Sequence, residues 1–305
     1  MVCLRSQDAL EATFAPQVGL TCCSLRHEGA ELLGERFGLA AYADSGISMG
    51  MSLMHPWADR LSSWSYTASG ATVRLPVSPL LHTDHWGLPV NGVLSSGDAW
   101  ALEDSGAAVE SAWLDAVLPF EQPRQLELFP FPHRVHLRAE MTGRSLCISV
   151  ELEATGSLPV PVCFGYRLYL RREQPRGDAT LVVPARRRLM TDERLLPTGA
   201  TEPLEMSAST LGIDELQEVF ALGADRRLTV ASDARRVTVE PLTGFPLAQV
   251  RTLAGEPHVM LEALTAAPDA LSRNTFPLAT PGRPYRAAVR VSTDDLSSDR
   301  SLLIT

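Results

Sequence analysis

Residues 54–61 combine several side-chain types that bind sugars. They read Met-His-Pro-Trp-Ala-Asp-Arg-Leu, and Pro56 keeps them out of a regular strand interior because proline cannot donate to a strand ladder. The indole of Trp57 could stack on the apolar face of a sugar ring, and the guanidinium of Arg60 offers a fixed fork of donors to hydroxyl groups. The alternative is a buried tryptophan beside a structural salt bridge, and the residue types favour neither.

Two further segments carry isolated polar side chains. Residues 87–92 form a loop rich in proline and glycine that contains Asn91, and residues 261–270 place Glu262 in a mostly apolar stretch. Glutamate is rarely buried unless it is paired. Glu262 is therefore either a surface residue at a strand edge or a functional carboxylate with an altered pKa.

Two other motifs are weaker. Residues 46–50 match the G-x-S-x-G nucleophile elbow, but that motif needs a following helix, whereas Pro56 comes within six residues. We interpret this match as chance. Residues 82–85, His-Thr-Asp-His, could hold a metal ion only with a further ligand from elsewhere in the chain. We expect them to form a polar loop with solvent-facing histidines.

Composition excludes several classes of function. The chain has 305 residues and a net charge of −9, which argues against general nucleic-acid binding. All 27 basic residues are arginine, so lysine Schiff-base and P-loop chemistry are excluded. No apolar run reaches the roughly 18 residues of a membrane span, and the N-terminus lacks an apolar signal segment, so we expect a cytoplasmic protein. The five cysteines lack metal-ligand spacing and are expected to be reduced thiols: Cys3, Cys22, Cys23, Cys147 and Cys163.

The elements that must position these residues are mostly strands. Residues 134–141 and 145–153 alternate apolar and polar side chains around a short glycine-containing turn, which predicts a β-hairpin with one buried face. Weaker strand patterns recur at residues 181–183, 228–231, 237–240 and 287–292. Helical periodicity is nearly absent; residues 213–220 allow two turns at most. We therefore expect an all-β antiparallel sandwich, with residues 1–305 as a single domain.

Several of these segments, in this order, resemble the aldose 1-epimerase (galactose mutarotase) family. The motifs that carry the resemblance are residues 55–61 (His-Pro-Trp-Ala-Asp-Arg-Leu), 88–92 (Leu-Pro-Val-Asn-Gly), 129–134 (Phe-Pro-Phe-Pro-His-Arg), 196–199 (Leu-Pro-Thr-Gly) and 261–270. The similarity extends from about residue 13 to residue 291. It implies a large antiparallel β-supersandwich, in agreement with the strand patterns, and it implies no cofactor and no metal.

The resemblance also implies a reaction, the interconversion of the α and β anomers of a free sugar. A general base removes the proton of the anomeric hydroxyl while a general acid protonates the ring oxygen, each contributing ~10²–10⁴-fold to the rate. The family's base corresponds to Glu262 and its sugar-binding arginine to Arg60.

Three positions depart from the family pattern. Asn91 stands where the family has a substrate-positioning histidine, and Arg167 stands where it has the general-acid histidine. A guanidinium has a pKa above ~12 and does not deliver a proton usefully at neutral pH. Gln217 corresponds to the family's aspartate, unless Asp214 reaches the site instead.

Two functions from different classes are compatible with these residues. The first is an epimerase with Glu262 as base and with water, Tyr169 or His85 as the acid. The second is a non-catalytic carbohydrate-binding or regulatory protein, because function depends on the site rather than on the fold. An anionic sugar (a hexuronate or a sugar phosphate) would suit a cationic pocket of Arg60, Arg167 and Arg251.

Alternatively, Arg167 pairs with Glu262 or Asp59 and fills the space of the missing histidine. The expected partner in either function is a small-molecule sugar, with no nucleic acid and no membrane. We expect the chain to be a monomer or a weak homodimer.

Overall fold

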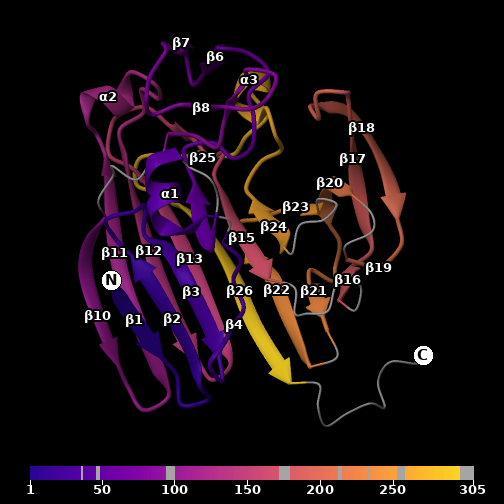
Figure 1. Cartoon of the computed structure of the whole chain (residues 1–305). Helices are drawn as coiled ribbons and strands as arrows, with labels where there is room; N and C mark the ends of the chain where they lie inside the picture. The colour runs from indigo at the N-terminus through magenta and orange to yellow at the C-terminus, as the bar shows by residue number, and fades with distance from the viewer. Residues whose placement is uncertain are drawn as a thin grey trace.

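The computed structural model describes residues 1–35, 37–45, 49–93, 100–171, 179–211, 215–232, 234–252 and 258–295. Within these ranges the chain forms two large antiparallel sheets that pack face to face (Figure 1). The antiparallel sandwich expected from the sequence is confirmed.

The first sheet has eleven strands among the described residues. In spatial order they are β1 (Val2–Arg5), β2 (Leu10–Ala15), β3 (Thr21–His27), β5 (Met51–Met54), β15 (Gly165–Arg171), β24 (His258–Leu264), β23 (Leu247–Thr252), β20 (Leu216–Leu222), β17 (Arg186–Thr191) and β18 (Pro197–Leu204), with β4 (Ala30–Glu31) paired to β3. Its central strands come from distant parts of the chain: β15 pairs with β5 on one side and with β24 on the other.

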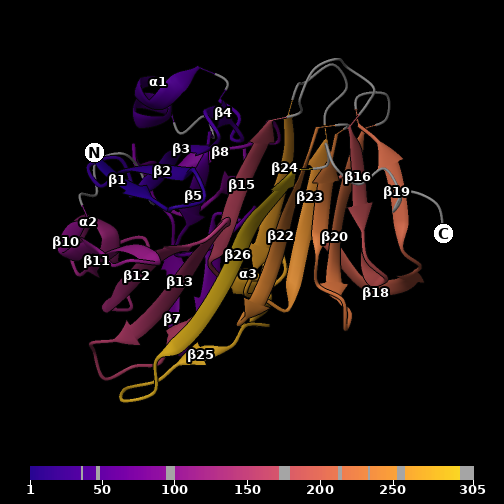
Figure 2. The ribbon, with the colours of Figure 1, turned by 90° about the horizontal axis from the view of Figure 1, so that it is seen from below.

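The second sheet has nine strands in the same described part of the chain. They are β10 (Ala101–Ala107), β11 (Ser111–Phe120), β12 (His133–Thr142), β13 (Ser145–Ala154), β26 (Tyr285–Asp295), β22 (Arg235–Thr243), β21 (Leu228–Ala231), β16 (Thr180–Val183) and β19 (Ser207–Thr210). Figure 2 shows the N-terminal strands at one side of the sandwich and β16 to β19 at the other.

Short elements complete the described structure. They are the strand pairs β6 (Ser65–Ala68) with β7 (Ala71–Arg74), β8 (His82–Thr83) with β9 (Pro89–Val90) and β14 (Val160–Pro161) with β25 (Leu278–Ala279), and the helices α1 (Gly38–Ser45), α2 (Pro123–Leu126) and α3 (Ala270–Arg273). Figure 1 shows β6 to β8, α2 and α3 gathered at one end of the sandwich. No helix in the described ranges is long and apolar enough to cross a membrane.

The predicted hairpin is confirmed as β12 and β13, whose side chains alternate between buried and partly exposed positions. The four weaker strand patterns are confirmed as β16, β21, β22 and β26. Of residues 213–220, for which the sequence allows two helical turns at most, 213 and 214 lie outside the described residues, and residues 216–220 belong to strand β20, which pairs with β23 and β17. Of the G-x-S-x-G motif, residues 46–48 lie outside the described residues, and Gly50 leads directly into strand β5 rather than into a helix.

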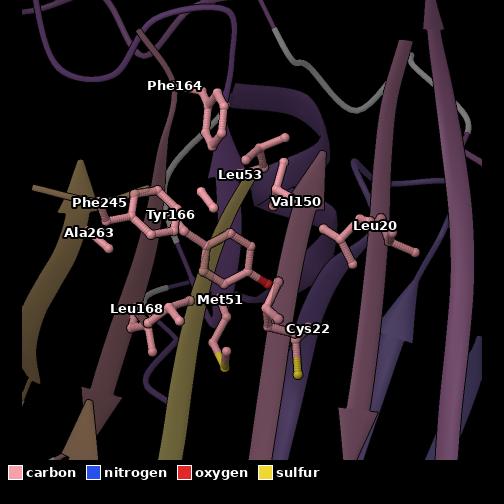
Figure 3. Close-up of a cluster of buried hydrophobic side chains, with 14 of the residues drawn as sticks. Leu20, Cys22, Met51, Leu53, Val150, Phe164, Tyr166, Leu168, Phe245 and Ala263 are labelled. Atoms are coloured by element: carbon pink, nitrogen blue, oxygen red, sulfur yellow. The ribbon is translucent and has the colours of Figure 1, made fainter. Parts of the chain in front are cut away.

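The core lies between the two sheets and buries side chains from both. Figure 3 shows Tyr166 and Leu168 of β15 beside Met51 of β5 and Cys22 of β3, with Val150 of β13 reaching in from the other sheet. Each of these side chains is at most 2% exposed. The opposite face of the central strands of the first sheet is therefore the face left to build a site.

Candidate active site

Strand register brings one row of side chains together on that second face. Residues directly opposite each other in antiparallel strands share a face. The row is Ser52 of β5, Arg167 of β15, Glu262 of β24, Gln249 of β23 and Val219 of β20. Strands from distant parts of the chain, β5, β15 and β20, thus meet the consecutive strands β23 and β24 at neighbouring positions.

Glu262 is the buried carboxylate of this row, with 2% of its surface exposed. Its Oε1 accepts a hydrogen bond from Nε of Arg167. Its Oε2 is also buried, and it accepts no hydrogen bond from any residue that the structure describes. Burial raises the pKa of the Glu262 carboxyl, and the charge of Arg167 opposes that rise. Of the two sequence interpretations of Glu262, the buried carboxylate with an altered pKa fits this environment.

Arg167 connects Glu262 to the Asn91 loop. Its Nη2 donates to Oδ1 of Asn91 at 3.0 Å. Burial lowers the pKa of Arg167, but the neighbouring Glu262 outweighs it, so the pKa lies above its ordinary value and the guanidinium stays charged. Among the sequence alternatives, the pairing of Arg167 with Glu262 is the arrangement that the structure contains.

The loop that carries Asn91 requires a glycine at position 92, because a larger residue would collide with the backbone of residue 55. Gly92 has φ +72°, and a Cβ atom built on it would lie 2.0 Å from the carbonyl oxygen of His55. Asn91 itself has φ +60°, a conformation that asparagine tolerates better than most residues. The close approach of Gly92 to residue 55 thus fixes where the Asn91 side chain meets Arg167.

We expect Gly92→Ala to destabilise the fold more than Gly87→Ala does. Both glycines have positive φ, +72° and +73°, so both variants carry the same backbone strain of about 1 kcal/mol or more. Only at Gly92 does the added methyl also meet backbone, because nothing lies within 4 Å at Gly87. Thermal unfolding of the two variants checks this. Equal melting temperatures would show that the contact with His55 does not constrain the loop.

Arg60 is buried and joins three loops. Its Nε lies 3.1 Å from Oδ2 of Asp84 and 3.5 Å from Oδ1 of Asp59, and its Nη1 donates to the carbonyl of Arg194 at 2.9 Å. The Trp86 ring, 37% exposed as a residue, lies 5.0 Å from its guanidinium carbon. These partners hold Arg60 beside Asp59 and Asp84, although its Nε makes no hydrogen bond with any described residue.

A pocket of about 120 Å³ opens beside this network. It is lined by Asp59, Arg188, Leu189, Met190, Thr191, Leu195, Gln217 and Val219. Gln217 therefore reaches the pocket, next to Val219 of the Glu262 row. Asp214, the sequence alternative to Gln217, lies outside the described residues.

Trp57 does not belong to the pocket. It is 1% exposed and packs in the core against Tyr66, with ring centroids 6.5 Å apart, so its indole face is not available to a sugar. This corrects its expected role as a sugar-binding residue. The alternative from the sequence, a buried tryptophan beside a salt bridge, matches what residues 57, 59 and 60 form.

The two acids suggested in place of the histidine differ in position. His85 is exposed and contacts Trp86 with the rings tilted by 39° and their centroids 3.5 Å apart, and it does not line the pocket. Tyr169 is two residues from Arg167 on strand β15 and therefore lies on the same face of the sheet as Arg167. Like His85, it does not line the pocket.

The structure adds three residues to those found from the sequence. Asp84 and Trp86 hold Arg60, and Oε1 of Gln249, next to Glu262, is buried with no hydrogen-bond partner among the described residues. The motif at residues 82–85 suggested only a metal for Asp84. No signal in the sequence pointed to Gln249, because its place beside Glu262 depends on strand pairing.

Metal binding is not favoured at either histidine group. Oδ1 of Asp84 accepts hydrogen bonds from the backbone N–H of Trp86 and Leu88, and its Oδ2 faces Arg60. In the described part of the chain, His27, Glu28 and Asp295 have ligand atoms within 4.8 Å of one another. Arg144 lies 3.2 Å from Oδ2 of Asp295, so that carboxylate already has a cation beside it.

Together, the sandwich and the ion-paired glutamate on its open face define a β-sandwich protein with a small polar pocket. The family model for aldose 1-epimerase matches residues 1–292. The chain belongs to the aldose 1-epimerase family.

Solved structures show the same fold. A galactose mutarotase-like protein from Clostridium acetobutylicum has a TM-score of 0.83 at 15% identity, over 94% of this chain and 93% of its own. A Synechocystis sp. PCC 6803 protein has a TM-score of 0.79 at 19% identity, over 96% and 95%. Galactose 1-epimerase from Lactobacillus acidophilus NCFM has a TM-score of 0.76 at 13% identity, over 96% and 93%. No curated protein sequence matches the chain.

Proposed function

We propose that the chain binds a free aldose between Glu262 and this pocket, whose lining does not include Glu262, and that it interconverts the anomers with Glu262 as the base. The observation that carries the proposal is the buried Oε2 of Glu262, which no described residue satisfies. A buried acceptor without a partner is costly, and the anomeric hydroxyl of an aldose would supply the missing donor. Burial also raises the pKa of Glu262, toward the range in which a carboxylate works as a base near neutral pH.

The proton movements of this reaction balance within the site. Oε2 of Glu262 takes the proton of the O1 hydroxyl as the bond between C1 and the ring oxygen breaks. The ring oxygen takes a proton from water or from Tyr169. After rotation about the C1–C2 bond, ring closure returns both protons and gives the other anomer. Arg167 would donate a hydrogen bond to the bound sugar and keep its own proton, because its pKa lies above its ordinary value.

A second candidate is a non-catalytic carbohydrate-binding protein. It is favoured by the ion pair itself, because the charge of Arg167 lowers the basicity of Glu262 and no described histidine lines the pocket. In both candidates the partner is a small sugar. We further propose that the chain is cytoplasmic and is a monomer or a weak homodimer.

The experiment that tests the first proposal is polarimetry of freshly dissolved α-D-glucose, α-D-galactose and α-D-xylose at several protein concentrations. We expect a rate proportional to the protein, and we expect Glu262→Gln to return it to the buffer rate. Glu151→Gln, on the second sheet in an ion pair with Arg286, is the matched control and should retain the rate.

Unchanged activity in Glu262→Gln would eliminate Glu262 as the base. A wild-type rate equal to that of buffer, together with a rise in melting temperature on adding sugar, would leave the binding protein as the function.

A further inference from the structure

The charges around the pocket cancel. Three arginines face three carboxylates near Glu262: Arg60, Arg167 and Arg251 against Asp59, Asp84 and Glu262. Arg188, the arginine that lines the pocket, donates to Glu202 and lies 3.6 Å from Glu218. Nε of Arg60 and Nε of Arg251 are buried without a hydrogen-bond partner among the described residues, but the positive and negative charges are balanced, so a ligand carboxylate or phosphate gains little net attraction. The site therefore does not favour an anionic sugar.

One wall of the pocket is apolar. Leu189, Leu195 and Val219 line it, and Val219 and Leu189 belong to a small hydrophobic cluster that also contains Met54 and Leu264. This cluster is separate from the main core between the sheets. A polar ligand group placed against the wall would lose its hydration without gaining a hydrogen bond.

The wall lies across the sheet from the base. Val219 is two strands away from Glu262 in the same row, roughly 10 Å at the usual strand spacing. Glu262 itself does not line the pocket, so a pyranose held by its O1 hydroxyl at Glu262 reaches the wall only if its ring lies along this row, with C4 to C6 toward Val219. We take this orientation as part of the inference. Gln217 and Thr191 line the same pocket and offer polar partners for the C4 hydroxyl. The group on C5 is left to meet the apolar wall.

We propose that the site selects neutral aldoses whose C5 carries hydrogen or methyl, that is, aldopentoses and 6-deoxyhexoses. This inference rests on the proposed function, because it places the anomeric hydroxyl at Glu262. The volume of about 120 Å³ supports it, since it leaves little room for a larger C6 group. Hexoses bind more weakly, and hexuronates and sugar 6-phosphates more weakly still.

The test uses sugars that differ only at C6. One series is L-arabinose, D-fucose, D-galactose and D-galacturonate; the other is D-xylose, 6-deoxy-D-glucose, D-glucose and D-glucuronate. Dissociation constants are measured by titration calorimetry, and anomer exchange by NMR. In at least one series we expect the 6-deoxy sugar to bind about 10-fold or more tightly than the hexose, the size of effect that one small group in an apolar pocket produces.

Two variants connect the preference to the wall. Leu195 has φ +61°, so Leu195→Asn keeps a backbone that asparagine tolerates while replacing the apolar side chain with an amide. Val219→Thr keeps the shape of the side chain and adds a hydroxyl. Both should reduce the 6-deoxy preference to within about threefold. Leu278→Ser, at an exposed position of β25, is the control and should leave it unchanged.

The outcomes separate the two proposals. Equal or tighter binding of the hexoses in both series would overturn the C6 inference and leave the proposed function standing. Tight binding of D-galacturonate or D-glucuronate would overturn it in favour of a cationic pocket. Binding of no sugar in either series would remove the proposed function, and the inference with it.

Discussion

Arg167→Met is expected to lower the free energy of unfolding at pH 7 by about 3–5 kcal/mol, the range measured when one partner of a buried ion pair is removed. The substitution leaves the Glu262 carboxylate buried without the guanidinium that donates to its Oε1. It also removes the hydrogen bond to Asn91. Chemical denaturation of the wild type and the variant measures the difference.

The pH dependence of this deficit identifies its cause. Burial raises the pKa of Glu262, so without Arg167 the folded state binds a proton more readily than the unfolded state does. The deficit should therefore be largest at pH 8 and shrink as the pH falls toward 5. The double variant Arg167→Met/Glu262→Gln should recover most of the stability and lose this pH dependence. A deficit that is the same at every pH would show that lost packing, and not the buried charge, is responsible.

Acid is expected to destabilise the fold through a buried pair of histidines. Nε2 of His133 lies 2.8 Å from Nε2 of His55, and Nδ1 of His133 lies 2.5 Å from the carbonyl of Phe131, so Nδ1–H of His133 donates to that carbonyl and its Nε2 accepts from His55. Burial lowers the pKa of His133 to about 4 and that of His55 well below its ordinary value. Both rings are neutral in the folded state.

The sign of the effect is set by proton binding. An unfolded histidine has a pKa of about 6.5, so between that value and about 4 the unfolded state binds more protons than the folded state. Stability should therefore fall as the pH drops below about 6.5, by about 1.4 kcal/mol per pH unit for each histidine. For His133 alone, the lowering of the pKa from 6.5 to about 4 corresponds to a loss of about 3 kcal/mol of stability.

Urea denaturation between pH 7.5 and 4.5 measures this slope. His133→Gln should reduce the slope whatever it does to stability at pH 7.5. His136→Gln, on the open face of the second sheet with 37% of its side chain exposed, should not change it. An unchanged slope in His133→Gln would show that His133 is not the source of acid sensitivity and would leave His55, His82 and the carboxylates as its source.

The sequence predicts the strands well where one face is buried and the other is solvated. The hairpin of β12 and β13 can be predicted from strict alternation because its register has to keep the apolar set inside. Alternation does not predict strand β20, because the apolar residues in 213–220 have a spacing that is compatible with a helix. Pairing with β17 and β23 decides the structure there, and pairing is a tertiary effect.

The site can be predicted only in part, again because strand pairing is a tertiary effect. Family motifs lead to Glu262, Arg167 and Asn91, which the structure brings into contact, although their roles remain proposals. The burial of Trp57 and the place of Gln249 beside Glu262 depend on which strands are neighbours. Residue types alone cannot supply that information.

The row from Ser52 to Val219 has a consequence for recovery of function after denaturation. Because its members come from β5, β15, β20, β23 and β24, the row is complete only when all five strands have paired. Contacts between residues so distant in sequence form late, after the cost of closing long loops has been met. During refolding, sugar binding should therefore return only with the final cooperative phase, which makes it a stringent measure of the yield of native protein.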